Sequence, residues 1–430
     1  MEWFWPEGFY AVVMVAAFAF GAFAFKLPIS IAMSASAIIG AALAGFGFPL
    51  RHLVEGMFGY IDTILIIASA MIFMNTVQSI GLMEAVAALI IRKFRSRPIM
   101  LSGGVMFLIM LPGMLTGSST AGVLTTGALV APVLIKLGVP VIKTAAFIAM
   151  GAIIGMIAPP INIPVMIIGG GIDMPYVGFT IPLLIATIPM ALFSMAVLVI
   201  PYLKGRGAID ETALEAELRR MENVTLSARL FLPFFVLIAL MSIDQIFAGK
   251  IPSLGMPLQF LLASASAFLT GRKWNVLDSA TDALRDAIPV LGILMGVGMF
   301  IQIMTLTGVR GFVVVSALAI PAWLLYVSIG ISMPAFGAIS SFGAASVLGV
   351  PFILALLSKD QIIVASGLSL IAGLGDLVPP TALAGIFAAQ VVGAKNYFAV
   401  LKDCIIPGAA IALWGICLIA LANPIAALIR

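Results

Sequence analysis

The chain has 430 residues, of which 63% are hydrophobic and only 9% are charged, and its mean hydropathy is +1.23. Apolar runs of membrane-spanning length, such as 8–24, 180–202 and 403–422, predict an all-α polytopic membrane protein and exclude an outer-membrane barrel, whose strands are short and alternating. The net charge of +4 comes mostly from basic loops, so nucleic-acid binding has no support.

The N-terminal segment "MEWFWPEGFY" has no basic region and contains Glu2 and Glu7, so we expect it to stay in the protein rather than to be cleaved as a signal peptide. Cys404 and Cys417 lie in one apolar segment without metal-ligand spacing, and the only histidine, His52, lies in a short connection. We therefore expect no transition-metal site and no cofactor. No segment resembles a nucleotide-binding loop, so ATP is not indicated.

Four sequence matches recur in the same order at an offset of about 220 to 230 residues, which indicates an internal duplication. They pair "KLPISIAMSASAIIGAAL" (26–43) with "GMPLQFLLASASAFLTG" (255–271), "MIFMNTVQSIGLMEAVAALI" (71–90) with "GMFIQIMTLTGVRGFVVVSA" (298–317), "GSSTAG" (117–122) with "GAISSFG" (337–343), and "GMIAPPINIPVMIIGGG" (155–171) with "GDLVPPTALAGIFAAQVVG" (375–393). The duplication predicts a first repeat at 1–203 and a second at 229–430. A cytoplasmic amphipathic linker, 204–228, joins them.

Each repeat is expected to contain three spans, an amphipathic connecting helix, a re-entrant hairpin and a broken helix, and the first repeat has a further span that returns to the linker. We predict the hairpins at about 99–137 and 322–357, and the broken helices at about 144–171 and 361–392. With the N-terminus outside, five of the 22 basic residues lie outside and 17 lie on the cytoplasmic side, as the positive-inside rule requires. The five are Arg51, Lys250, Arg310, Lys359 and Arg430. The repeats then have inverted topology, which is typical of transporters.

Polar breaks interrupt this apolar chain at four places. They are the hairpin tips near "TGSSTAG" and "AFGAISSFGAA", and the proline pairs Pro159-Pro160 and Pro379-Pro380. An unpaired backbone group in hydrocarbon costs several kcal/mol, so such breaks belong where the chain lines a cavity. Proline ends one half-helix and frees a carbonyl one turn earlier. Freed carbonyls and hydroxyls suit Na⁺, and half-helix N-termini suit a carboxylate.

The candidate ligands are the polar side chains at these breaks. Hydroxyl and amide groups suited to an anionic substrate belong to Thr116, Ser118, Ser119, Thr120, Asn162, Ser340 and Thr381. Asp376 in "GLGDLVPP" is the one acidic residue well within an apolar segment, and it could bind Na⁺, carry a proton or cap a half-helix. Two alternatives remain open: the hydroxyls bond back to their own helices, and Asn162 and Thr381 only cap the broken helices.

These segments resemble the large membrane subunit of tripartite ATP-independent periplasmic (TRAP) transporters, within the wider ion transporter superfamily. The resemblance covers most of the chain, from "KLPISIAMSASAIIG" to "GLGDLVPPTALAGIFAAQVVGA". It implies a transporter rather than an enzyme, which takes up a small organic anion (a carboxylate, dicarboxylate or sugar acid) with Na⁺ by an elevator mechanism. The implied location is the inner membrane of a bacterium or archaeon. The implied partners are a small four-helix membrane subunit and a periplasmic substrate-binding protein.

Carried over residue by residue, the resemblance places the Na⁺ ligands at the same breaks as the substrate ligands. They are Gly117, Ser118, Ser119, Pro160 and Asn162 in the first repeat and Ser340, Ser341, Pro380 and Thr381 in the second, with Asp376 as a further candidate. The chain departs from the family pattern at two points near these sites. The family usually has an acidic residue after the first hairpin tip, where this chain has "TAGVL", and "LDGT" in the second hairpin, where it has "AFGAISSFG".

A second hypothesis is a single-component permease or antiporter of the same superfamily. It would share the duplication and the hairpins but would need no binding protein, and it could be driven by protons. A requirement for partner proteins during uptake distinguishes the two hypotheses.

Overall fold

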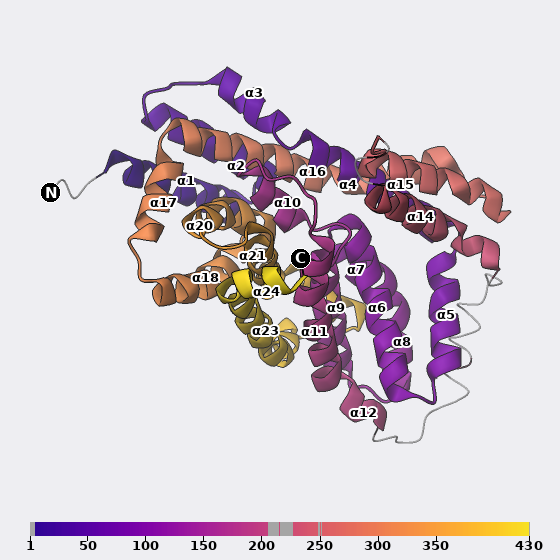
Figure 1. Cartoon of the computed structure of the whole chain (residues 1–430). Coiled ribbons are helices and arrows are strands. Elements are labelled where there is room, and N and C mark those ends of the chain that lie inside the picture. Colours follow the sequence, from indigo (N-terminus) through magenta and orange to yellow (C-terminus); the bar gives the residue numbers. More distant parts are fainter. Residues whose placement is uncertain (1–4, 205–214, 216–226, 248–249, 251, 430) are drawn as a thin grey trace.

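The computed structural model describes residues 5–204, 215, 227–247, 250 and 252–429. Within these ranges all regular structure is helical (Figure 1). Eight of the described helical segments are long and apolar enough to cross a membrane. Nearly all of the predicted linker, 204–228, lies outside the described residues, although its Glu215 accepts a hydrogen bond from Arg92 at 3.2 Å.

The first repeat runs through eleven α-helices and one π-helical turn of the described chain. They are α1 (Pro6–Phe23), α2 (Ile29–Leu43), α3 (Leu50–Phe58), α4 (Ile61–Ser79), α5 (Leu82–Phe94), α6 (Pro98–Thr116), α7 (Ser119–Gly122), η1 (Val123–Gly127), α8 (Ala128–Lys136), α9 (Val141–Ile157), α10 (Ile163–Gly170) and α11 (Thr180–Leu198), and the short α12 (Ile200–Lys204) follows them. Helices α6 to α8 form the first re-entrant hairpin. Helices α9 and α10 are the two halves of the first broken helix.

The second repeat has the same order of elements. It contains η2 (Ala228–Phe231), α14 (Leu232–Ile246), α15 (Gly255–Ala265), η3 (Ser266–Thr270), α16 (Val276–Leu306), α17 (Val309–Leu318), α18 (Ala322–Gly337), α19 (Ser341–Ala344), η4 (Ala345–Gly349), α20 (Val350–Ala355), α21 (Gln361–Gly373), η5 (Leu374–Leu377), α22 (Leu383–Val391) and α23 (Tyr397–Ala420), and α24 (Ala422–Ile429) follows. The single long α16 corresponds to α3 and α4 together. Helices α18 to α20 form the second hairpin, and α23 corresponds to α11.

The two repeats together build two layers. Helices α1, α2, α4, α14, α15 and α16 lie along one side of the molecule, and both hairpins, both broken helices, α11 and α23 gather on the other side (Figure 1). Within the first layer α16 packs on α2 and α4, which belong to the other repeat. The connecting helices α5 and α17 pack on the hairpin helices α6 and α20 and join the layers. We call these layers the scaffold and the hairpin domain.

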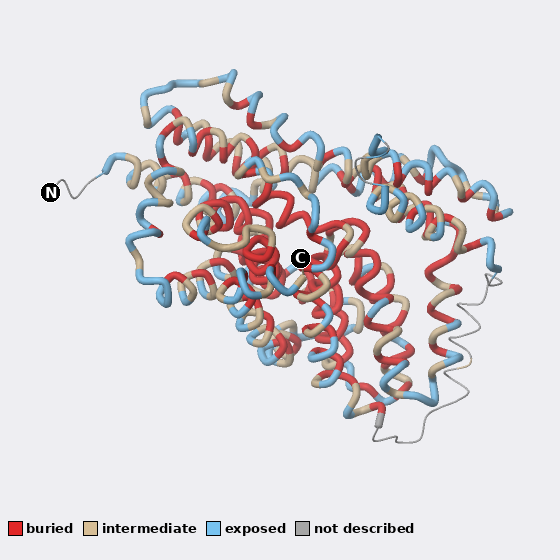
Figure 2. Tube along the Cα trace, in the orientation of Figure 1, coloured by how far each residue is buried: buried red, intermediate tan, exposed pale blue. Residues whose placement is uncertain are grey.

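The core of the protein lies around the broken helices (Figure 2). Every residue of α9 from Thr144 to Ile157 is buried, and so is every residue of α21 from Ile363 to Gly373. In contrast, only Pro233 and Leu237 are buried in α14 of the scaffold. A helix that is apolar on all sides belongs in the interior of a membrane protein, whereas one with few buried residues faces lipid or a partner.

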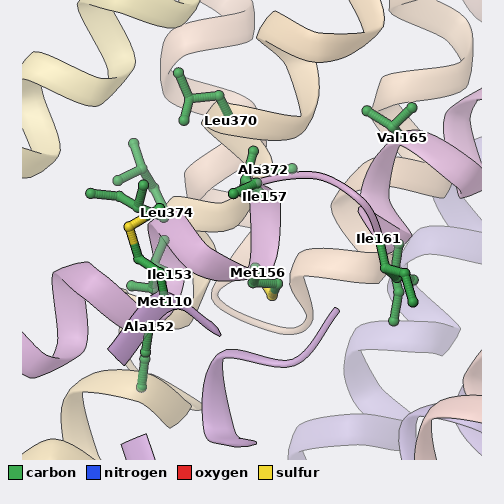
Figure 3. Close-up of a cluster of buried hydrophobic side chains, with 14 of the residues drawn as sticks. Met110, Ala152, Ile153, Met156, Ile157, Ile161, Val165, Leu370, Ala372 and Leu374 are labelled. Carbon is green, nitrogen blue, oxygen red and sulfur yellow. The ribbon is translucent and has the colours of Figure 1, made fainter. Parts of the chain in front are cut away.

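Apolar packing connects the two repeats at this core. A cluster of buried side chains joins Met110 of α6 with Ile153 and Ile157 of α9 and with Leu370 and Leu374 of the second repeat (Figure 3). All five side chains are at most 7% exposed. The hairpin domain is therefore one packed unit that draws on both halves of the chain.

Candidate functional site

The two hairpin tips are built alike. In the first hairpin, α6 ends at a left-handed Gly117 (φ +67°), and Ser118 caps α7 by accepting a hydrogen bond from the Ala121 amide at 3.3 Å. In the second, Ser340 caps α19 by accepting a hydrogen bond from the Gly343 amide at 3.1 Å. In each hairpin a π-helical turn follows the short helix. Ser118 thus corresponds to Ser340, and the next residues, Ser119 and Ser341, also correspond.

The two proline breaks are also built alike, and each is tied to its own hairpin. Both Pro-Pro bonds are cis. After the first pair, the Ile161 amide donates to the carbonyl of Met114 at 3.1 Å. After the second pair, Thr381 donates to the carbonyl of Ala338 twice, from its amide at 3.3 Å and from its hydroxyl at 2.7 Å. Each hairpin tip is therefore held against the break of the broken helix in its own repeat.

The hairpins of both repeats meet at Asp376. This residue lies in η5, directly before the second break, and only 6% of it is exposed. The hydroxyl of Ser119, from the first hairpin, donates to Asp376 Oδ2, and the hydroxyl of Ser341, from the second hairpin, bonds to the same carboxylate. No basic side chain in the described ranges lies within 4.0 Å of this carboxylate. The arrangement is a buried group of oxygen atoms around one carboxyl group, without a basic side chain of the described ranges beside it.

Glycine pairs allow this close approach. An added Cβ on Gly113 of α6 would lie 2.8 Å from the amide nitrogen of Met156 and 2.9 Å from the carbonyl carbon of Gly155. In the second repeat an added Cβ on Gly375 would lie 2.5 Å from the Cα of Gly337. Gly155 and Gly375 each lie four residues before a proline pair. In both repeats the hairpin and the broken helix thus touch backbone to backbone beside the break.

Asn162 is completely buried and its amide group is fully engaged. Its Oδ1 accepts a hydrogen bond from the Val165 amide at 2.9 Å, which caps α10. Its Nδ2 donates to the carbonyl of Ile157 at 2.8 Å and to the hydroxyl of Ser369, in the other repeat, at 3.0 Å. Asn162 therefore joins the two halves of the first broken helix to α21, as the capping hypothesis requires.

We expect Asn162→Ala to lower the free energy of unfolding by about 2 to 4 kcal/mol, because it removes a helix cap and leaves buried amide and carbonyl groups without partners. Thermal unfolding of the purified protein in detergent measures this loss. Ser369→Ala is the matched comparison, since it removes only one of the three bonds and should cost less. Equal stability of Asn162→Ala and the unchanged protein would contradict this role.

The other predicted ligands lie at the tips and breaks, outside the group formed by Ser119, Ser341 and Asp376. Thr116 lies beside the tip, but its hydroxyl donates to the carbonyl of Pro112 in its own helix at 2.7 Å. The Pro160 carbonyl accepts a hydrogen bond from Tyr176 at 3.0 Å. Thr120 is half-buried on α7, and Pro380 is exposed. The structure thus brings Ser119, Ser341 and Asp376 together, whereas Thr116, Ser118, Ser340 and Thr381 bond to nearby backbone.

A comparison with known protein families covers nearly the whole chain. The sequence model of the tripartite ATP-independent periplasmic transporter, DctM component, matches residues 12–425. The chain belongs to the DctM family. It is therefore the large component of a three-part transport system. This component is a multi-pass protein of the bacterial inner membrane. A search of curated proteins finds no match.

Solved structures confirm the predicted fold class of two inverted repeats with re-entrant hairpins and broken helices. The Alcanivorax borkumensis YdaH transporter matches with a TM-score of 0.64 and 15% identity, over 95% of this chain and 98% of its own. The Neisseria gonorrhoeae MtrF, described among a class of antimetabolite efflux pumps, matches with a TM-score of 0.61 and 14% identity, over 97% of this chain and 94% of its own. At this identity the likeness concerns the fold.

Two features of this DctM-family chain were missed from its sequence. The glycine pairs beside the breaks were not singled out, although a glycine four residues before each proline pair was visible in the duplicated segments. The residue-by-residue correspondence after the breaks is the second feature, since Asn162 and Thr381 lie one position apart relative to their proline pairs. By their contacts Thr381 corresponds to Ile161, and Asn162 corresponds to Ala382, which precedes α22.

Proposed function

We propose that this DctM-family protein takes up a small organic anion across the inner membrane together with Na⁺. The observation that supports this proposal most directly is the meeting of Ser119, Ser341 and Asp376. A carboxylate buried without a cation is costly in a membrane protein, and a bound cation reduces that cost. Carboxylate and hydroxyl oxygens are the ligands that hard cations prefer. The backbone carbonyls freed near each proline pair could complete the coordination of Na⁺.

The anion is proposed to bind beside the ion, at the half-helix ends. The N-termini of α7 and α19 lie at the hairpin tips, and α10 and α22 begin just after the breaks. Partial positive charge at such ends favours a carboxylate, and a bound Na⁺ adds a full charge. Co-transport also supplies energy, because each positive charge that enters across 100 mV contributes about 2.3 kcal/mol.

The movement that exchanges the two sides is proposed to be an elevator motion. The hairpin domain is one packed unit drawn from both repeats, and the ion and anion would move with it against the scaffold. The connecting helices α5 and α17 contact both layers and would act as flexible joints. Because the site is formed by both hairpins, movement of the whole domain carries the bound solutes without taking the site apart.

The partners are proposed from the family and from exposed surfaces. A three-part system contains a small membrane component and a periplasmic binding protein besides this chain. Helix α14 exposes Phe235, Ile238 and Ile243 on the scaffold, and these apolar side chains offer a surface to a small four-helix subunit. The binding protein would deliver an organic acid, such as a dicarboxylate or sugar acid, from the outer side.

The alternative proposal is a single-component, proton-coupled permease. The same Asp376 favours it, because a buried carboxylate that accepts hydrogen bonds from two hydroxyls can also alternate between its charged and protonated forms. Export remains a further outcome of the test, given the description of MtrF as an efflux pump.

Uptake into proteoliposomes tests the proposal. Succinate and N-acetylneuraminate serve as probes under an imposed Na⁺ gradient or an imposed proton gradient, with and without the candidate partners. Uptake that needs both Na⁺ and the partners supports the tripartite proposal. Uptake by the chain alone under a proton gradient supports the permease instead.

We expect Ser119→Ala and Ser341→Ala each to raise the Na⁺ concentration for half-maximal uptake about tenfold, because each removes one oxygen atom from the carboxylate group. The same uptake assay, with Na⁺ varied at constant ionic strength, measures this shift. Ser34→Ala is the control, since its hydroxyl donates to the carbonyl of Ser30 in its own helix, away from the tips. A normal Na⁺ dependence in both hairpin variants would rule out this site.

A further inference from the structure

Two cavities lie at equivalent places in the two repeats. The larger, of about 530 Å³, lies between the connecting helix α17 and the second hairpin and is lined by Thr305, Gly308, Arg310, Val314, Leu354 and Leu357, among others. The smaller, of about 330 Å³, lies between the connecting helix α5 and the first hairpin. In both repeats the connecting helix begins after a left-handed glycine, Gly81 (φ +77°) or Gly308 (φ +76°). Each cavity thus separates the scaffold from one hairpin.

The two connecting helices differ in the charge of the side chain that lies at their positive N-terminal end. No side chain caps either α5 or α17. In α5, Glu84 lies in the first turn and supplies a negative charge near the uncapped amides. In α17 the first turn has no acidic residue and instead contains Arg310, so a positive side chain adds to the positive helix end. The larger cavity is therefore the one whose helix end carries no acidic residue of its own.

Arg310 has donors to offer such an anion. Its Nη2 donates to the carbonyl of Gly171 at 2.6 Å, and a guanidinium group has five N–H donors in all. No carboxylate of the described chain lies within 4.0 Å of it. Glu7 of α1 lies beside Gly308, close to where an added Cβ would contact its side chain at 3.1 Å. Glu7 thus moderates the positive charge without pairing with Arg310.

The side chains that line the cavity indicate the chemistry of the rest of the ligand. Val314, Val315, Leu354 and Leu357 line it with apolar surface, and Val315 and Leu357 are each 53% exposed. In a membrane protein, a site with one charged end and exposed apolar walls suits a molecule with an anionic head and an acyl chain. A small dicarboxylate would leave its second charge against these apolar side chains.

We propose that the larger cavity binds an anionic phospholipid, with its phosphate at Arg310 and the first amides of α17 and an acyl chain along Val315 and Leu357. The distribution of basic residues assigns Arg310 to the outer side, so the lipid belongs to the outer leaflet. It fills the gap between the scaffold and the second hairpin. The lipid composition of the bilayer thereby influences the contact across which the hairpin domain moves.

The test measures access to the cavity in nanodiscs. The full chain, with Cys404→Ala and Cys417→Ala, receives Val314→Cys, and its reaction with N-ethylmaleimide is timed in phosphatidylcholine with a rising fraction of phosphatidylglycerol. We expect phosphatidylglycerol to slow labelling about tenfold, and Arg310→Gln to abolish this protection. Arg310→Lys keeps the charge and should retain part of it. Glu7→Gln should strengthen it.

Matched controls separate this site from general charge effects. Arg51→Gln removes an exposed basic residue on the same side, and Glu84→Gln removes the charge at the equivalent cavity, so neither should change the protection. Equal protection by phosphatidylcholine, or protection that survives in Arg310→Gln, would overturn the proposal. Protection by succinate in pure phosphatidylcholine would also overturn it and would assign the cavity to the transported acid.

Discussion

Asp376→Asn is expected to lower Na⁺-driven uptake by at least about a hundredfold, because it removes the one negative charge where the two hairpins meet. Asparagine has nearly the same size and can still accept a hydrogen bond from Ser119, so the hairpin tips should stay in place. The change removes the charged ligand of the cation in a buried, low-dielectric site. Loss of one partner of such a buried charge pair costs about 3 to 5 kcal/mol of interaction free energy. Initial uptake rates at fixed Na⁺ measure the effect.

Asp282→Asn is the control for this experiment. Asp282 lies on α16 with its side chain 61% exposed, beside Arg285 at 3.8 Å, and a surface pair of this kind contributes little. Exchange of labelled for unlabelled solute adds a second readout. Under proton coupling, Asp376→Asn should abolish net uptake but preserve exchange, since exchange needs no change in protonation. Full Na⁺-driven uptake by the variant would remove Asp376 from the mechanism.

Gly375→Ala is expected to abolish uptake and to lower the free energy of unfolding by about 1 to 3 kcal/mol. Its added methyl group would lie 2.5 Å from the Cα and 2.6 Å from the carbonyl oxygen of Gly337, and neither backbone atom can rotate away as a side chain can. The second hairpin must therefore shift away from η5, which separates Ser341 from Asp376. Uptake and thermal unfolding are measured on the same preparation.

Gly408→Ala provides a close comparison on α23. An added Cβ there meets only the Leu374 side chain at 3.7 Å, which is an ordinary van der Waals contact. We expect it to behave like the unchanged protein, whereas Gly113→Ala in the first repeat should resemble Gly375→Ala. Similar behaviour of Gly375→Ala and Gly408→Ala would show that the close contact of the glycines is not required.

The sequence predicted the elements of this protein better than their contacts. Broken helices follow from chemistry that is local to the chain, since the proline pairs and the polar tips cannot continue a helix in hydrocarbon. The duplication then gave their order and the inverted topology. Asp376 stood out because an acidic residue in an apolar segment is costly. Its partnership with Ser119 was not predictable, because 257 residues separate the two in the chain.

Asn162 shows why a ligand and a cap are hard to distinguish in a sequence. Both roles call for an amide directly after a break, and only the positions of Val165, Ile157 and Ser369 reveal that the amide is already engaged. The glycines could not be recognised as important from the sequence, because they contribute no side-chain chemistry of their own. Their value lies in the absence of a side chain at a place where two backbones touch, which depends on tertiary packing.

The two breaks are related by the duplication but differ in how far their residues are buried. Pro159 is buried and Pro160 half-buried, whereas Pro379, Pro380 and the following Leu383 are exposed. The two repeats thus have similar sequences but place their breaks in different surroundings. Each break shows a conformation that the corresponding segment of the other repeat can adopt. If the halves exchange these surroundings, the first break becomes the uncovered one and the second closes. On this basis the opposite-facing conformation is expected to expose Pro159 and Pro160 and to bury Pro379 and Pro380.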